Sequence, residues 1–158
     1  MADNLNRMIE LVTEFFDTRN DPDQISVTEE ERKKLEEIHP ATLSEFANED
    51  GPIVWILLIP TTQDIMDRFL KGVLSEKQLL QETQPGKTYD AIYMCSVYIL
   101  PEFRHKGLAK KVGLEAINSI RKDHPIKSLF YWPFSEEGRG LAKAAEQATG
   151  LPVYERKN

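Results

Sequence analysis

The segment PIVWILLIP at residues 52–60 places seven consecutive apolar side chains between two prolines. The apolar run is far too short to span a bilayer, and its length and its flanking prolines are typical of a strand rather than a helix. A strand that lacks polar alternation is buried on both of its faces. The chain is therefore expected to form a layered α/β domain whose sheet is covered by helices.

The region before this strand is predicted to be helical. Apolar residues at intervals of three and four predict an amphipathic helix over residues 3–17. Thr28 and Glu31 form a capping box, which predicts a second helix that ends before Pro40. The pattern of residues 41–51 is ambiguous: it is compatible with a short helix that ends at the segment NEDG.

The region after the strand alternates between helices and strands. Thr61 or Thr62 is a predicted helix N-cap, and Ser75 with Gln78 predicts a second capped helix. Beyond them the sequence predicts a strand at 89–100, a helix at 105–122, a strand at 126–132, a helix at 137–149 and a short strand at 151–156. This order contains a strand–helix–strand unit of the kind that builds parallel sheets.

Length and charge restrict the classes of function. A chain of 158 residues is most simply one domain, 1–158, and its net charge of −6 argues against general nucleic-acid binding. One cysteine permits no internal disulfide and no cysteine-rich zinc site. The polar start of the chain lacks the apolar core of a signal peptide, so we expect a cytoplasmic protein with no membrane partner.

The segment LPEFRHKGLAKK at residues 100–111 concentrates positive charge around a glycine at a predicted helix start. The first N–H groups of a helix are unpaired, and a glycine lets an anion approach them closely. The tetrapeptide GLAK recurs at 140–143, also near a predicted helix start, but there Glu136 and Glu137 would repel an anion. The copy that begins at Gly107 is therefore the predicted phosphate site.

The strand at 89–100, the segment PEF and the following helix resemble the central segment of the GNAT superfamily of N-acetyltransferases, which use acetyl-coenzyme A. The resemblance covers about residues 89–154. It implies a mixed central sheet with helices on both faces, to which this chain adds a helical N-terminal region. The cofactor-binding motif of the family, R/Q-x-x-G-x-G/A, would fall on Arg104, His105, Lys106, Gly107, Leu108 and Ala109, with Lys110 completing the turn.

The same resemblance implies how the rest of the cofactor is bound. In that fold a bulge separates the central strand from the next one, and the exposed strand backbone pairs with pantetheine. By position these groups belong to Val97, Tyr98 and Ile99. The free N–H groups of such a bulge are also suitable donors to a developing oxyanion.

The chain departs from the family at the usual positions of the acid and the base. The tyrosine that often protonates the departing thiolate is replaced by Glu146, and the N-x-x-A sequence that often starts the last helix reads Arg139 to Ala142. Where some members carry a glutamate base, this chain has Tyr93. Tyr93 is thus a candidate for ordering the water that takes the proton of the amine, although a strand tyrosine is also commonly a core residue.

We therefore expect an N-acetyltransferase that moves an acetyl group from acetyl-coenzyme A to an amine by direct attack. The alternative is a non-catalytic coenzyme A-binding module with the same fold, which the missing acid and base favour. The acceptor would be a small-molecule or peptide amine, and a homodimer remains open.

Other interpretations of the sequence are weaker. The acidic segment 17–28 has a calcium-loop length, but its sixth position is Pro22 instead of glycine and its twelfth is Thr28 instead of glutamate. The three histidines share no ligand spacing, so capping or surface roles are expected and no metal is. Cys95 lies within a predicted strand, where a buried apolar role is favoured over a nucleophilic one.

Overall fold

The computed structural model describes residues 4–19, 29–104, 106–132 and 136–157. Within these ranges five strands form one mixed sheet, which confirms the predicted α/β fold class. In the order in which they lie side by side, the strands are β1 (Leu43–Asn48), β2 (Gly51–Thr61), β3 (Ala91–Ile99), β4 (Ser128–Tyr131) and β5 (Val153–Glu155). The first two pairings are antiparallel and the last two are parallel.

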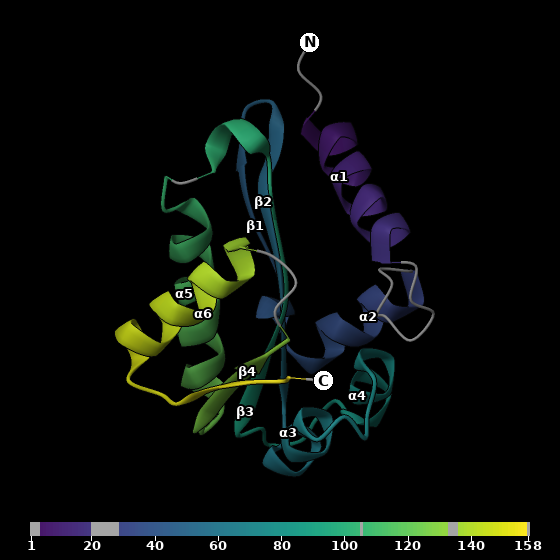
Figure 1. Ribbon diagram of the computed structural model, residues 1–158, viewed down its shortest axis with the longest axis vertical. Helices are drawn as coiled ribbons and strands as arrows, with labels where there is room; N and C mark the ends of the chain where they lie inside the picture. Colours follow the sequence, from purple (N-terminus) through teal and green to yellow (C-terminus); the bar gives the residue numbers. More distant parts are fainter. Residues whose placement is uncertain (1–3, 20–28, 105, 133–135, 158) are drawn as a thin grey trace.

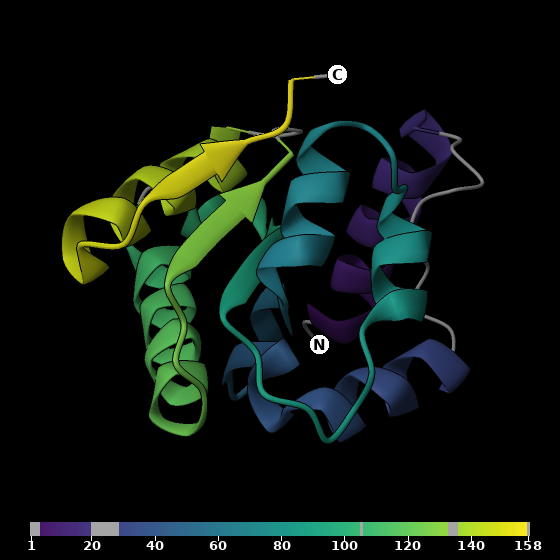
Figure 2. The same ribbon diagram turned by 90° about the horizontal axis from the view of Figure 1, so that it is seen from below.

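Helices cover both faces of this sheet (Figures 1 and 2). One face carries α1 (Asn4–Arg19), α2 (Glu29–Ile38), α3 (Gln63–Leu70) and α4 (Glu76–Glu82), and the other carries α5 (Leu108–Asp123) and α6 (Glu136–Thr149). Two short 3-10 turns, η1 (Pro40–Thr42) and η2 (Pro101–Phe103), lead into β1 and out of β3. None of the helices in the described ranges has the length and apolar character needed to cross a membrane.

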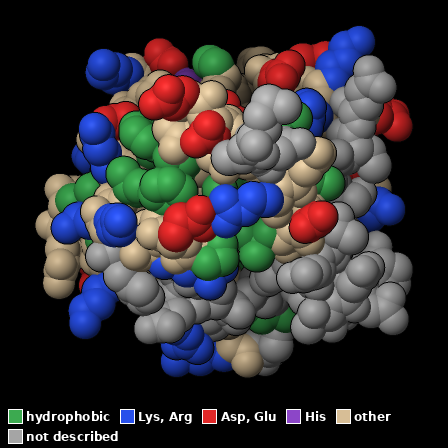
Figure 3. All heavy atoms as spheres, turned by 90° about the horizontal axis from the view of Figure 1, so that it is seen from above, with side chains coloured by type: hydrophobic (Ala, Val, Ile, Leu, Met, Phe, Trp, Pro, Cys, Tyr) green, Lys and Arg blue, Asp and Glu red, His purple; other side chains and the backbone are tan. Residues whose placement is uncertain are grey.

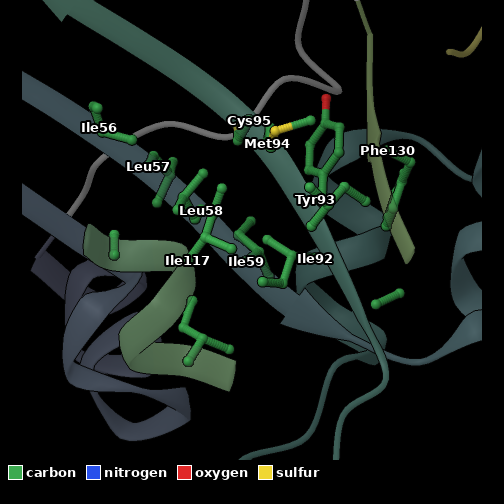
Figure 4. Packing of buried hydrophobic residues seen from close by; sticks show 14 of the residues in the cluster. Ile56, Leu57, Leu58, Ile59, Ile92, Tyr93, Met94, Cys95, Ile117 and Phe130 are labelled. Atoms are coloured by element: carbon green, nitrogen blue, oxygen red, sulfur yellow. The ribbon is translucent and has the colours of Figure 1, made fainter. Parts of the chain in front are cut away.

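The strand predicted from PIVWILLIP lies at the centre of the core. Residues 53, 54 and 56–59 expose at most 6% of their surface, so β2 is buried on both faces as predicted. Figure 4 shows Ile56 to Ile59 of β2 beside Ile92 of β3, with Ile117 of α5 packed below them. Burial of this run between helices on both sides removes a large apolar surface from water and so stabilises the fold.

Two predicted helix starts after β2 are present at the expected residues. The hydroxyl of Thr62 accepts the N–H of Ile65 at the start of α3. Ser75 and Gln78 form the reciprocal capping box of α4. These caps satisfy N–H groups that a helix cannot pair internally, which is why the local sequence is sufficient to predict them.

Residues 43–48 form a strand, so the prediction of a short helix within residues 41–51 is wrong. β1 pairs with β2 from Leu43 opposite Leu57 to Asn48 opposite Gly51. Gly51 has a φ of 120°, which closes the tight turn between the two strands. The apolar neighbour β2 supplies the pairing partner, so tertiary contact overrides a weak local preference.

A bulge divides β3 at Cys95. Leu57 of β2 lies opposite Ser96 and the next residue, Leu58, lies opposite Met94, so β3 has one additional residue, Cys95, in this register. The bulge shifts the alternation of side chains along β3. Tyr93 and Val97 are consequently on opposite faces, whereas strict alternation along a strand without a bulge would predict one shared face.

The same position marks the separation of β3 from β4. The parallel pairing of these strands runs from Ala91 opposite Ser128 to Met94 opposite Tyr131 and ends there. Among the described residues, the rest of β3 has only β2 as a strand neighbour. Half of the central strand therefore presents backbone groups toward the β4 side of the sheet.

Candidate functional site

The start of α5 has the backbone geometry of an anion site. Gly107 is the N-cap and adopts the left-handed conformation, with φ 78° and ψ 7°. A Cβ atom at this position would meet nothing within 4 Å, so the space beside the turn is open. The first bond within the helix runs from the N–H of Lys111 to the carbonyl of Gly107. The preceding N–H groups, those of Leu108, Ala109 and Lys110, have no acceptor inside the helix.

The two GLAK segments have different conformations. Gly107 is an N-cap with positive φ, whereas Gly140 is the fifth residue of α6 and is not among the glycines with positive φ. The second segment begins one turn inside α6, which starts at Glu136, one residue before the predicted start. The N–H groups of an α-helix interior are paired, so the first segment is the better anion site.

The positive side chains around Gly107 are only partly directed at the turn. The Nε of Arg104 donates to the carbonyl of Ile99 at 3.3 Å, which attaches this side chain to the end of β3. Lys106 is exposed, and its ammonium lies 5.9 Å from the centre of the Phe103 ring. Lys110 is exposed as well, whereas His105 lies outside the described residues.

An ion pair attaches the N-terminal helix to the turn before this site. The guanidinium of Arg7 contacts both carboxylate oxygens of Glu102, at 2.8 and 2.5 Å. The hydrogen bonds from Arg7, with a smaller effect of Lys106, lower the pKa of Glu102 to about 2. Figure 3 views this end of the molecule, where basic, acidic and apolar side chains are mixed. Arg7 thus neutralises a carboxylate that would otherwise repel an anion at the nearby helix start.

The backbone of β3 beyond the bulge is partly available for hydrogen bonds. The N–H of Leu100 donates to the carbonyl of Ile53, so the antiparallel alternation pairs the backbone of Tyr98 with β2 as well. The backbone groups of Val97 and Ile99 then point away from β2, toward the side that β4 has left. The carbonyl of Ile99 already accepts from Arg104. Of the three residues predicted to bind pantetheine, Val97 therefore has the most accessible backbone.

Tyr93, the candidate catalytic residue, lies fully inside the core. Its ring stacks on Phe130 at 5.1 Å between centroids and lies 4.8 Å from Phe69, and Figure 4 shows it beside Phe130. Its hydroxyl donates a short hydrogen bond to the buried carboxylate of Glu76. This hydrogen bond gives the buried carboxylate of Glu76 a donor, which a polar group inside a protein requires.

Glu76 is a residue that the sequence did not single out. It is 2% exposed at the first position of α4, and its Oε2 lies 3.6 Å from the Sγ of Cys95. The capping box at Ser75 gave a sufficient reason for an acidic residue in the first turn of a helix, so nothing in the sequence indicated a buried contact. Cys95 is itself buried, as its place within the strand suggested.

The histidines and acidic groups do not assemble a metal site in the described part of the chain. His39 accepts the N–H of Ala41 on Nδ1 and contacts Asp123 through Nε2 at 2.7 Å, so it caps η1 and joins it to the end of α5. His124 packs on Tyr89 with 4.7 Å between ring centroids, and burial lowers its pKa. Both rings have structural roles, in agreement with their irregular spacing.

The last helix and strand carry polar contacts near the end of β4. Arg139 lies 3.6 Å from the carboxylate of Glu155. Burial, together with the nearby negative charges of Glu155 and Glu146, raises the pKa of the Tyr131 phenol. Tyr131 is the residue at which β4 separates from β3, so a protonated phenol lies where the two strands diverge.

A cavity of about 700 Å³ lies between the N-terminal helices and the sheet. This "α1 groove" is bounded by α1, by α2 and by the face of β1, β2 and β3 that α1 covers. The apolar residues that define it are Leu5, Ile9 and Val12 of α1 and Trp55, Leu57 and Tyr98 of the sheet. Ser96, next to the bulge, also lines it, so the groove reaches the half of β3 that does not pair with β4.

Comparison of the chain with protein-family models, with curated proteins and with solved structures finds no match in any of the three. Any assignment of function therefore depends on the geometry of the start of α5 and of the bulged strand before it.

Proposed function

We propose that this protein binds acetyl-coenzyme A at the start of α5 and transfers the acetyl group to an amine. The observation that carries the proposal is the left-handed N-cap at Gly107, beside which the space is open. The strand before it, β3, has a bulge and does not pair with β4 beyond Met94. A pyrophosphate needs several converging N–H donors, and an extended pantetheine chain needs free strand backbone. The two requirements meet within 14 residues here, from Val97 to Lys110.

The residues have separate tasks in this proposal. The N–H groups of Leu108, Ala109 and Lys110 would bind the pyrophosphate, assisted by the positive end of the 16-residue helix α5. The backbone of Val97 would pair with pantetheine and bring the thioester toward the bulge. Lys106 and Lys110 are exposed and would add positive charge from the solvent side.

Acetyl transfer by direct attack requires that the ammonium lose a proton and that the departing thiolate be stabilised. Tyr131 is a suitable proton donor, because a phenol with a raised pKa remains protonated at neutral pH. The charge of Glu146 contributes to this raised pKa. Glu146 stands at the position where GNAT enzymes often carry the tyrosine acid, so Tyr131 lies near that position. Tyr93 does not take the ammonium proton in this proposal, since it is buried and already hydrogen-bonded to Glu76.

The second candidate function is a coenzyme A-binding module without turnover. The observation that favours it is the full burial of Tyr93, which leaves the predicted base position inside the core. A panel of primary amines incubated with acetyl-coenzyme A separates the two functions. Amine-dependent release of coenzyme A supports the transferase, whereas stabilisation of the fold by coenzyme A without any release supports the binding module. Absence of both would contradict the proposed cofactor.

A further inference from the structure

The α1 groove combines an apolar floor with charge at one end. Trp55, Leu57 and Tyr98 form the floor, and Leu5 and Ile9 of α1 form a wall that is about half exposed, at 49% and 47%. Exposed apolar side chains that face an open cavity have a binding role more often than isolated ones do. At about 700 Å³ the groove has the size of a small-molecule site, roughly 300–1,000 Å³.

The ends of the groove differ in chemistry. The charged residues that line the groove are Glu45 of β1 and Glu36 and Arg32 of α2, with Arg32 one helical turn before Glu36. Two carboxylates and one guanidinium give the described lining of the groove a net negative charge. One oxygen of Glu45 accepts the indole N–H of Trp55 at 2.7 Å, which fixes the carboxylate over the floor.

The opposite end of the groove is Ser96 of β3. Register places Leu43, Leu57 and Ser96 in one row across the sheet, so the floor runs from β1 through β2 to β3. Two strand spacings separate the outer strands, which is about 10 Å. Ser96 follows the bulge at Cys95 and lies beyond the last residue pair between β3 and β4.

We infer that the acceptor is a diamine with a long apolar spacer, bound across the floor of the α1 groove. This inference rests on the proposed function, because the reactive amine must meet the thioester at the bulge near Ser96. The distal ammonium lies against Glu36 and Glu45, and the spacer covers Trp55 and Leu57. Charge complementarity selects a cation at the distal end, and the apolar floor selects methylene groups between the two amines.

The transfer itself balances without a further reactant. The neutral amine forms a C–N bond with the acetyl carbonyl carbon while the C–S bond breaks. The amine proton leaves to a base or to water, and the thiolate is released as coenzyme A. The distal ammonium takes no part in the bond changes, so its contribution appears in binding and in the choice of acceptor.

Three probes test the inference with the intact protein: 1,8-diaminooctane, n-octylamine and 1,3-diaminopropane. Binding is followed through the indole N–H resonance of Trp55, assigned with a Trp132→Phe variant, so the readout does not require turnover. We expect 1,8-diaminooctane to bind at least tenfold more tightly than 1,3-diaminopropane and to be a better acetyl acceptor than both of the others by kcat/KM. n-Octylamine lacks the distal cation, and 1,3-diaminopropane is too short to span the floor.

Matched variants identify which contacts are responsible. A Glu36→Gln/Glu45→Gln variant should reduce kcat/KM for diaminooctane to that for n-octylamine and leave kcat/KM for n-octylamine unchanged, because n-octylamine oriented for transfer has no cation at these carboxylates. A Leu5→Ser/Ile9→Ser variant should weaken both eight-carbon probes by about tenfold, since both lose apolar contact. Val73→Ser is the control, because Val73 is 63% exposed and does not line the groove.

The failure of this inference is distinguishable from that of the proposed function. If coenzyme A stabilises the fold but diaminooctane binds and reacts no better than the other two probes, the diamine assignment is overturned and the cofactor site stands. If diaminooctane binds at Trp55 while coenzyme A produces no stabilisation, the acceptor role is overturned together with the proposed function. Equal affinity of the double glutamine variant for diaminooctane would also overturn the assignment.

Discussion

Arg7 of the first helix holds both carboxylate oxygens of Glu102, which lies 95 residues later in the turn before Gly107. The pair joins α1, one wall of the α1 groove, to the segment that begins the proposed cofactor site. It is exposed to solvent, so it orients the two segments more than it stabilises them. A single contact thus connects the surroundings of both proposed ligands.

The first prediction concerns the titration of this pair. The pKa of Glu102 is lowered to about 2 from a reference near 4.5, so the pair contributes fully above about pH 4.5. Its contribution is lost as the pH falls toward about 2. In an Arg7→Gln variant the carboxyl carbon of Glu102 should titrate near its ordinary pKa when followed by NMR. An unchanged midpoint in the variant would show that Arg7 is not the cause of the shift.

The second prediction separates the two roles of Tyr93. Tyr93→Phe removes the donor to a buried carboxylate, which should lower the free energy of unfolding by about 1–3 kcal/mol. Coenzyme A binding should be unchanged, and turnover should remain within a few-fold of the wild type because the hydroxyl already donates to Glu76. The measurements are denaturant unfolding and initial rates over pH 6 to 9. A loss of about a hundredfold in turnover, partly restored at high pH, would instead assign Tyr93 to catalysis.

The third prediction concerns the close contact of α5 with α6. A Cβ atom added at Gly113 would lie 2.5 Å from the Cδ1 of Leu141, a buried side chain. Gly113→Ala should therefore destabilise the fold by about 1 kcal/mol, because overpacking exceeds the gain in helix propensity.

Gly140→Ala is the matched control for Gly113→Ala. A Cβ atom at Gly140 meets nothing within 4 Å, so this substitution in α6 should stabilise the fold by about 0.5–1 kcal/mol. Thermal unfolding of the two variants gives the comparison. Equal stabilisation by both substitutions would contradict the proposed packing of α5 on α6.

The fourth prediction tests Tyr131 as the proton donor. Tyr131→Phe should lower kcat by about tenfold to a hundredfold and leave the stabilisation by coenzyme A unchanged, since the phenol is needed only for the departing thiolate. An acetyl donor with a more acidic thiol should recover much of the lost rate. Unchanged turnover in the variant would mean that the thiolate leaves without this phenol.

The sequence predicted the parts of the fold that depend on local chemistry. The buried run of β2 and the caps at Thr62 and Ser75 follow from residues a few positions apart. β1 was missed because its strand conformation depends on pairing with β2, which no local pattern reports. The family resemblance implied a bulge in this strand but did not give its position at Cys95, since the residues around Cys95 carry no local signal of a register shift.

In the candidate site, too, the features that depend on contacts between distant segments could not be predicted from local sequence. Two identical GLAK segments adopt different conformations, because the start of α6 lies a full turn before Gly140. Glu76 was not singled out because its burial depends on Tyr93 and Cys95, which belong to a different part of the chain. The α1 groove also could not be predicted, since it requires the placement of two helices over three strands.

The stabilisation of the fold by coenzyme A in a Gly107→Val variant is the most direct test of the central claim. In the wild type, coenzyme A at about a hundred times its dissociation constant should stabilise the fold by roughly 2.7 kcal/mol. The branched side chain would fill the open space at the N-cap and is strained at a φ of 78°, so the shift should disappear in this variant. Gly140→Ala should retain the full shift. An undiminished shift in a folded Gly107→Val protein would contradict a cofactor site at the start of α5.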